Sequence, residues 1–257
     1  MFAVPKSAVN DLLERLDALM VRGRDDLELR RIELDALSQV KKGGGLVAPY
    51  SCVLGAVYSH KFDWMKAEAY FNEAILGADD DNVIVYRLNK NSGLHNTYQI
   101  SKAAELSLAL FEANRDNLVV LEQAMYMARW ALRFDWLENL MKNRGRLVEG
   151  EAQSLTQGEK SFVQRLKSNK ISFDQVGIAL DVAAVVLADE KLQRRSASVF
   201  INSEGAALYT FVADVSPQEA SRLTFVMAEK VMEACAVNIL DSLVFNVIPY
   251  ESAAVSQ

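Results

Sequence analysis

The side chains that most often carry catalysis are scarce in this chain of 257 residues. It contains two histidines, His60 and His95, and two cysteines, Cys52 and Cys235. Neither histidine lies at metal-ligand spacing from the other or from a cysteine. Cys52 and His60 are eight residues apart, which is about 12 Å along a helix and too far for a nucleophile–base pair. We therefore expect no metal, no cofactor and no catalytic residue among these groups.

Acidic clusters and a glycine run are the next candidates for chemistry. Asp25-Asp26 and Asp79-Asp80-Asp81 fall at expected helix ends and turns, where carboxylates cap helices. The run Lys41-Lys42-Gly43-Gly44-Gly45 follows an expected helix, whereas a phosphate-binding loop follows a strand and opens a helix. Both features indicate local structure. An enzyme whose acidic residues meet between two domains stays an alternative, because local spacing does not test it.

Basic residues gather in one stretch of an acidic chain, whose net charge is −6. Between residues 141 and 170, lysines and arginines outnumber the glutamates, and glycines at 145, 150 and 158 interrupt the stretch. This pattern predicts a hinge followed by a short helix over residues 157–167. A basic run is usually a solvated face, and contact with an anionic partner is the alternative. The candidates for that contact are Arg144, Arg146, Arg165 and Lys167.

Length and composition fit a folded protein of one or two domains. Hydrophobic residues make up 51% and charged residues 24% of the chain, which is ordinary for a globular protein. No apolar run reaches the roughly 18 residues of a membrane span, and residues 1–6 lack the pattern of a secretory signal. We expect a cytoplasmic protein with buried thiols and no membrane contact. The negative charge makes nucleic acid an unlikely partner.

The stretch 48–81 predicts a helical hairpin that organises the first part of the chain. Small and apolar residues recur in it every three or four positions, as one face of a helix requires. Glycine inside a helix costs about 1 kcal/mol relative to alanine, so Gly55 marks a close contact between helices. Phe71 has small neighbours on its face and is expected in the core. The positions that carry the pattern are Leu54, Gly55, Tyr58, Ala67, Phe71 and Ala74.

This hairpin resembles a tetratricopeptide repeat, which has Leu-Gly, Tyr, Ala, Phe and Ala at matching positions. The chain departs from that pattern at Ser51, Phe62 and Asp79. The resemblance implies an all-α domain of stacked helical hairpins over residues 1–150.

Internal repetition supports further hairpins. Phe62-Asp63-Trp64 returns as Phe134-Asp135-Trp136, 72 residues later, which predicts units of 36 residues with Tyr98 in the turn region of the middle unit. In this register Trp130 takes the place of Tyr58. Asn139 and Asn143 take those of Ala67 and Phe71, so the third unit is expected to be degenerate.

The same resemblance implies a groove, lined by the first helix of each hairpin, that binds a peptide of another protein. No lysine or arginine falls at the groove positions, so the carboxylate clamp of some family members is not expected. The groove would accept an amphipathic helix or a terminal segment of the chain itself. Carried over by position, its residues are Cys52, Ala56, Ser59, His60, Leu88, Ser92, His95, Asn96, Ala128 and Leu132.

Residues 151–257 predict a different, smaller domain. The expected order is helix, strand, strand, helix, strand, over residues 174–190, 196–202, 207–215, 216–237 and 243–248. Ser216-Pro217 followed by Glu219 is a strong helix start. The fold class is therefore α+β: an N-terminal helical-repeat domain, then a two-layer α/β domain with order α-β-β-α-β, in which two helices pack on one face of a three-stranded sheet.

The last strand bears on self-association. Residues 243–248 are apolar except for Asn246, which predicts a strand buried on both faces. Two helices cover only one face of the sheet, so the repeat domain or the same sheet of a second subunit must cover the other. We expect a homodimer through this sheet, because two-fold dimers are the commonest oligomers.

These features together predict a protein–protein interaction scaffold or regulatory adaptor with no catalysis of its own. A nucleic-acid-associated regulator using the basic hinge, and an enzyme with an acidic site between domains, are the alternatives.

Overall fold

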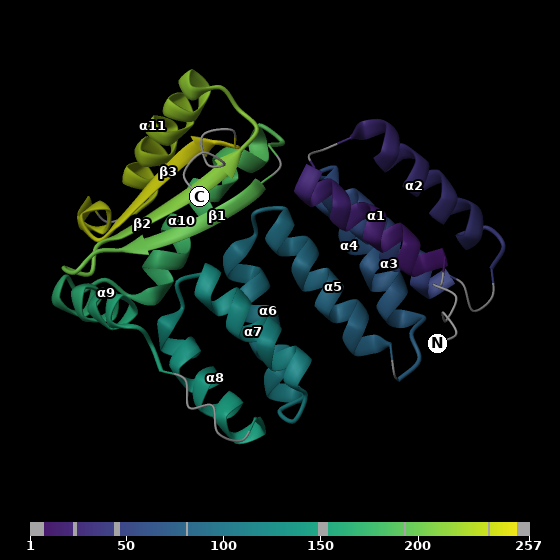
Figure 1. The fold of residues 1–257 in the computed structure, drawn as a ribbon, viewed down its shortest axis with the longest axis horizontal. Coiled ribbons are helices and arrows are strands. Elements are labelled where there is room, and N and C mark those ends of the chain that lie inside the picture. Colours follow the sequence, from purple (N-terminus) through teal and green to yellow (C-terminus); the bar gives the residue numbers. More distant parts are fainter. Residues whose placement is uncertain are drawn as a thin grey trace, which may run out of the picture. The chain divides into compact units, whose positions relative to one another are not determined.

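The computed structural model describes residues 8–22, 25–43, 47–80, 82–148, 154–192, 194–235 and 237–250. Over these residues the chain forms ten α-helices in succession and then a three-stranded sheet, with an eleventh helix between its second and third strands (Figure 1). The predominantly helical fold with a small C-terminal sheet agrees with the expected α+β class. The chain divides into two compact units, residues 1–97 and 98–257.

This division differs from the expected boundary at residues 150/151. The helices from α6 (Ile100–Ala113) onward belong with the sheet, since α10 (Phe173–Asp189) packs on α6. The hydroxyl of Tyr98 donates to the carbonyl oxygen of Leu192 at 2.9 Å. Asp181 of α10 accepts a hydrogen bond from the backbone N–H of Ser101 at 3.1 Å, which caps the first turn of α6. Residues 149–153 of the expected hinge lie outside the described residues.

The first unit is built around a central helix, α3. Helices α1, α2, α4 and α5 all pack against it. Phe71 of α4 is completely buried, as predicted. A Cβ added at Gly55 or Gly93 would lie within 2.7 to 2.8 Å of the Phe71 ring, so both glycines let α3 and α5 approach it. The bounds are α1 Ala8–Arg22, α2 Asp26–Val40, α3 Val47–His60, α4 Trp64–Leu76 and α5 Val83–Asn96.

A buried carboxylate joins α2 to the turn after α3. Glu33 is 3% exposed and accepts hydrogen bonds from the Tyr58 hydroxyl at 2.7 Å, from Lys61 Nζ at 2.8 Å and from Arg30 Nη1 at 2.6 Å. Burial alone would raise the pKa of Glu33. The hydrogen bonds from Lys61, Tyr58 and Arg30 outweigh burial and lower that pKa from 4.5 to about 2. The charge of Glu33 is therefore fully paired inside the unit.

The second unit places six helices around the sheet. Helix α7 packs against α6 on one side in sequence and against α8 on the other. Helix α10 packs on both α6 and α11. Helix α9 begins with a complete capping box, in which Thr156 and Glu159 bond to each other's backbone N–H groups. The remaining bounds are α7 Leu118–Trp130, α8 Phe134–Leu147, α9 Gln157–Ser168 and α11 Pro217–Ala234, with a 3₁₀ helix over Val237–Asp241.

The sheet has the predicted element order. Strands β1 (Arg194–Ile201) and β2 (Ala207–Ala213) pair antiparallel, and β2 pairs in parallel with β3 (Leu243–Pro249), which gives a mixed sheet in the order β1-β2-β3. One face carries aromatic residues of the core: Tyr209 lies against Trp130 and Phe245, and Phe211 lies against Tyr98. Ring packing therefore ties the sheet to α7 and to the turn before α6.

Strand β3 is not buried on both faces. Leu243, Phe245 and Val247 are buried, whereas Val244 is 47% exposed, so burial alternates along a strand whose residue types do not. The face of the sheet that carries Val244 is therefore partly open to solvent. The outer edge of β3 is covered by α11, where the Thr224 hydroxyl accepts a hydrogen bond from the N–H of Val247 at 2.9 Å. This contact satisfies a backbone group that no neighbouring strand pairs.

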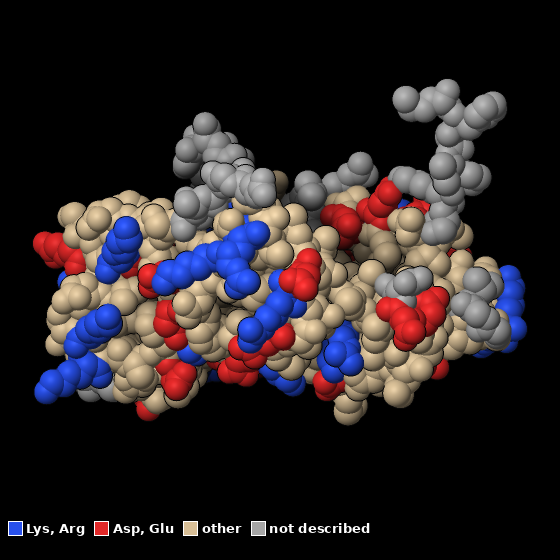
Figure 2. Space-filling model, turned by 90° about the horizontal axis from the view of Figure 1, so that it is seen from below, with Lys and Arg blue, Asp and Glu red and all other residues tan. Residues whose placement is uncertain are grey.

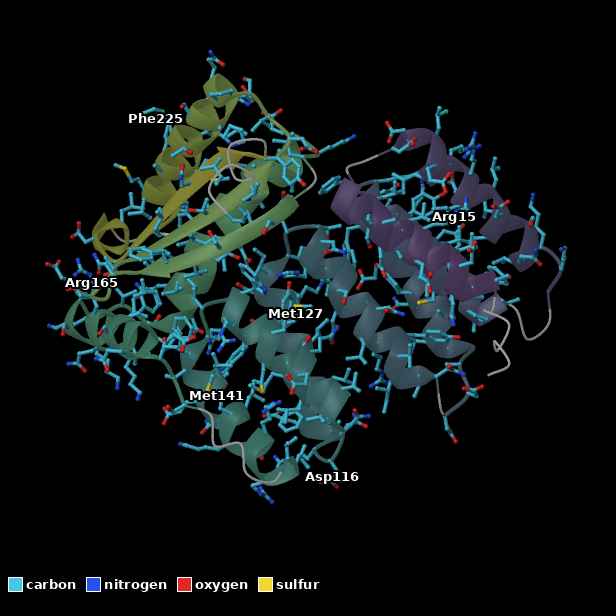
Figure 3. All side chains as sticks on the ribbon, in the orientation of Figure 1. Arg15, Asp116, Met127, Met141, Arg165 and Phe225 are labelled. Atoms are coloured by element: carbon cyan, nitrogen blue, oxygen red, sulfur yellow. The ribbon has the colours of Figure 1, made fainter. Side chains whose placement is uncertain are left out.

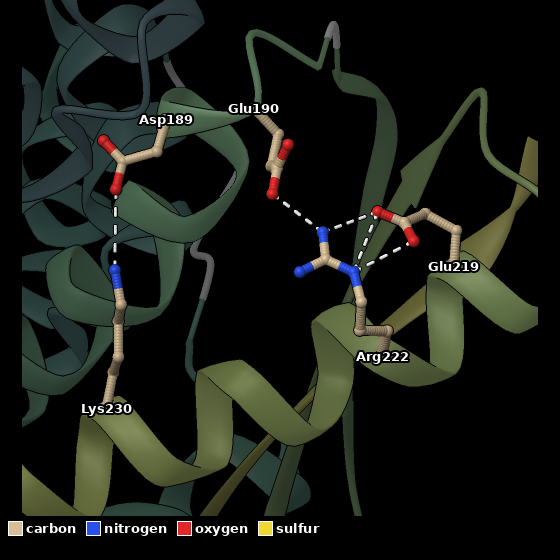
Figure 4. A network of polar contacts seen from close by, with 5 residues as sticks. All are labelled: Asp189, Glu190, Glu219, Arg222 and Lys230. Atoms are coloured by element: carbon tan, nitrogen blue, oxygen red, sulfur yellow. Dashed lines mark hydrogen bonds and ion pairs between the residues drawn. The ribbon is translucent and has the colours of Figure 1, made fainter.

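Polar side chains also join α10 to α11 (Figure 4). Arg222 binds Glu219 at 2.6 Å and Glu190 at 2.7 Å, and Lys230 reaches Asp189 at 3.5 Å. These side chains are roughly half-exposed or more exposed, so the contacts fix orientation more than they stabilise.

The turns between paired helices show a regular repeat, but with a shorter second spacing than expected. Phe62, Tyr98 and Leu132 each have a positive φ, between 56° and 64°, and each is the second residue after a helix end. From 62 to 98 is 36 residues, and from 98 to 132 is 34. The counterpart of Phe62 is therefore Leu132, whereas Phe134 begins α8 as Trp64 begins α4. The repeated tripeptide thus places the third hairpin two residues too late in the chain.

The corrected spacing removes the expected degeneracy of the third hairpin. Leu137 and Met141, and not Asn139 and Asn143, take the places of Ala67 and Phe71. The middle hairpin has Ala103 and Ser107 there. The residues at these positions in all three hairpins are buried: Ala67, Phe71, Ala103, Ser107, Leu137 and Met141. The structure thus has a recurring hairpin pattern through residue 147.

Candidate functional site: a cleft between helices α8 and α9

The ten expected groove residues are not an open surface. Cys52, Ser59, His95, Ala128 and Leu132 are all buried, between 0% and 3% exposed. The other five, Ala56, His60, Leu88, Ser92 and Asn96, are half-buried.

The turn spacing explains why both groove residues expected in the third hairpin are buried. With a spacing of 34, the counterparts of Ala56, Ser59 and His60 in α7 are Tyr126, Arg129 and Trp130, and not Ala128 and Leu132. Tyr126 is 50% exposed and Arg129 is exposed. The expected spacing of 36 residues therefore assigned the groove to buried positions of the third hairpin, whereas the observed spacing assigns it to more exposed positions of α7.

Two of the four candidate cations are used within the second unit. Arg144 pairs with Glu122 of α7 at 2.6 Å. Arg165 donates to the carbonyl oxygen of Asp241 at 2.6 Å and to that of Glu204 at 3.3 Å. Both guanidinium groups therefore hold elements together. Arg146 and Lys167 are exposed, and neither has a carboxylate within salt-bridge distance among the described residues.

Lys167 lines a cleft between α8 and α9 that local sequence patterns did not indicate. The cleft has a volume of about 570 Å³. Phe134 and Leu155 form a buried apolar floor, and Phe134 is fixed from below by an edge contact with Phe162, ring centroids 5.7 Å apart. The full lining is Phe134, Asp135, Glu138, Lys142, Ser154, Leu155, Lys160, Val163, Gln164, Lys167 and Phe173.

Helix α9 divides its side chains between three environments. Phe162 and Leu166 are buried in the core, and Arg165 binds the backbone near the sheet. The third side faces the cleft with Lys160, Val163, Gln164 and Lys167, which are spaced three, one and three residues apart and so share one face of a helix. The lysines therefore stand about 10 Å apart along the helix axis, with an apolar residue between them.

The charges around the cleft are unevenly compensated. Asp135 is paired with Arg133 at 2.8 Å, and Glu138 with Lys142 at 3.2 Å. Lys160 and Lys167 have no carboxylate within salt-bridge distance in the part of the chain that the structure describes. Seen from below Figure 1, this side of the second unit carries basic side chains interspersed with acidic ones (Figure 2). The cleft thus combines an apolar floor with two exposed cations.

The surroundings of Cys52 disfavour its reactive thiolate form. Cys52 accepts a hydrogen bond from Asn89 at 3.3 Å, and burial raises its pKa from 9 to about 11, which keeps the thiol protonated and unreactive at neutral pH. No group of three or more histidine, cysteine or acidic residues among the described residues is placed to hold a metal ion.

No family model matches this chain, and neither a curated protein nor a solved structure matches it. Within the described residues, no single helix is long and apolar enough to cross a membrane. Helices α9 and α10 taken together reach that length and composition, but they are bent by 106°.

Proposed function

We propose that this protein is an interaction scaffold that binds a segment of a partner protein in the α8–α9 cleft. The observation that carries the proposal is an apolar floor, formed by Phe134 and Leu155, beside Lys160 and Lys167, which have no described carboxylate partner. Such a combination of apolar contact and orienting charge is typical of sites that bind short segments of other proteins. The succession of helical hairpins supports a relationship to tetratricopeptide-like scaffolds.

Nucleic acid is the weaker candidate for this cleft. Asp135 and Glu138 line it together with the lysines, and carboxylates would repel the closely spaced phosphates of a nucleic acid strand. A protein segment can instead place one or two acids at chosen positions and fill the floor with an apolar side chain. The free cysteines Cys52 and Cys235 support a reducing compartment such as the cytoplasm.

A peptide selection on the full chain tests the proposal. A displayed library of random peptides is selected on the wild-type protein, and the enriched peptides are measured against Val163→Arg, which fills the cleft. Phe225→Arg is the matched control, because Phe225 is 76% exposed on the outer side of α11 (Figure 3). We expect binding to fall at least about tenfold with Val163→Arg, a change of about 1.4 kcal/mol, and to persist with Phe225→Arg.

Two results would contradict this function. One is the absence of any enriched peptide. The other is a set of peptides whose binding is indifferent to Val163→Arg while circular dichroism shows the variant folded.

A homodimer through the C-terminal sheet is a second proposal, and the structure changes the residue that tests it. Phe245 is 3% exposed on the aromatic core face, whereas Val244 is 47% exposed on the opposite face. Val244→Asp should therefore separate the subunits without unfolding the sheet. A light-scattering mass of one subunit for the wild-type protein rules the homodimer out.

A further inference from the structure

The geometry points to an acidic amphipathic helix as the occupant of the α8–α9 cleft, with two carboxylates seven residues apart and an apolar side chain between them. This inference rests on the proposed function and deepens it, because it specifies the chemistry and spacing of the partner segment. It depends on the cleft-facing side of α9 and on which charges there are already paired.

Charge complementarity defines the two anionic positions. Lys160 and Lys167 lie two helical turns apart on the same face of α9 and are both exposed. The other cleft cation, Lys142, is 3.2 Å from Glu138 of its own helix. An occupant therefore gains most by placing one carboxylate at each of the two lysines of α9, about 10 Å apart.

The apolar position follows from what lies between the lysines. Val163 is half-buried and lines the cleft above Phe134 and Leu155, which are 2% and 6% exposed. A leucine or phenylalanine of the occupant would displace water from this floor, and the removal of apolar surface from water favours binding.

The backbone of the occupant is set by the shape of the site. Two neighbouring helices form a trough that accepts a third helix by packing of side-chain ridges into grooves. In a helix, seven residues repeat the roughly 10 Å distance between the lysines, and the residue three or four positions after the first acid faces the same side. An extended segment would cover the distance in about three residues, so the two backbones require different spacings of acids.

Fluorescence anisotropy with designed helical peptides tests the inference on the full chain. The first peptide has glutamates seven residues apart and a leucine four residues after the first, and the second has glutamine at both positions. The third keeps the leucine and places the glutamates three apart. We expect the first peptide to bind about tenfold more tightly than the others, since only this peptide can form both ion pairs from a helix.

Variants of the protein locate the effect. Lys160→Glu and Lys167→Glu should each weaken binding of the first peptide by about tenfold. The double variant should instead bind a peptide with lysines in place of the glutamates. Lys102→Glu, an equal change of charge at an exposed residue of α6, should leave binding unchanged.

Specific outcomes overturn the inference. Equal binding of the glutamine peptide, tighter binding of the three-spaced peptide, or an equal loss with Lys102→Glu would each do so. Binding of a single-stranded oligonucleotide that depends on both lysines, without peptide binding, would also overturn it. If the peptide library yields ligands of the cleft that lack acids, the proposed function stands and the acidic helix is wrong.

Discussion

The polar centre at Glu33 and the cleft between α8 and α9 use lysine in opposite ways. In the first unit, Lys61 lies 2.8 Å from a carboxylate that is almost completely buried, and Tyr58 and Arg30 complete its hydrogen bonds. In the second unit, Lys160 and Lys167 border an apolar floor and have no described carboxylate nearby. A cation that is fully paired inside its own unit serves stability. In the proposed function, a cation beside an open apolar surface is available to a partner.

The largest expected effect concerns the interior of the first unit. Phe71→Ala removes a fully buried ring that is tightly enclosed at Gly55 and Gly93, so it should lower the free energy of unfolding by about 3–5 kcal/mol. Trp64 reports on this unit when the other two tryptophans are replaced by phenylalanine, and urea unfolding followed by its fluorescence measures the change. A shift below about 1 kcal/mol would mean that this interior is loosely packed.

The paired centre should respond next most strongly. Glu33→Gln removes the negative charge that three donors share and leaves Lys61, 25% exposed, without its counter-ion. We expect a loss of about 3 kcal/mol, at the lower end of the range for a broken buried pair, because Arg30 and Lys61 can partly reach water. The same fluorescence measurement checks it. An unchanged midpoint of unfolding would show that the centre contributes nothing to stability.

Some of this molecule could be predicted from its sequence, for identifiable physical reasons. Phe71 follows from the spacing of small residues around it, and α11 from Ser216 and Pro217, because both depend on neighbours within a few positions. The role of Arg144 could not be predicted, because its partner, Glu122, is 22 residues away on the facing helix. The turn at Leu132 was hidden for a related reason: its positive φ is held by backbone bonds and burial, and no glycine marks it.

The candidate site, too, depends on contacts between helices that local sequence does not reveal. The sequence indicated a basic stretch and included Lys167 among its candidates, but gave equal weight to Arg165, which binds carbonyl oxygens of its own unit. Lys160, Phe134 and Leu155 were missed, because they meet only when α8 and α9 pack. The available signal was the spacing of Lys160, Val163 and Lys167, which places them on one face of a helix.

The pH dependence of the first unit sharpens the contrast. The pKa of Glu33 falls from 4.5 to about 2 on folding, so the folded state favours the ionised form. This contribution is fully present above pH 4.5 and is lost as the pH falls from 4.5 toward 2, by about 3 kcal/mol in total. Urea unfolding of the wild type and Glu33→Gln across this pH range measures it. The difference between the two proteins should shrink with acid, and a constant difference would contradict the pairing.

The smallest expected effect on stability is at the cleft, because its two lysines, unlike Lys61 beside Glu33, are not expected to stabilise the fold. Lys160→Glu with Lys167→Glu reverses two exposed charges that make no described ion pair, so no buried group loses a partner and the apolar floor is unchanged. The free energy of unfolding should therefore change by no more than about 0.5 kcal/mol, against the several kcal/mol expected at Glu33. Thermal and urea unfolding of this double variant, beside Lys102→Glu as the matched reversal elsewhere, measure the difference. A loss comparable to that of Glu33→Gln would show that the two lysines serve the fold, and the distinction between a paired centre and an available one would fail.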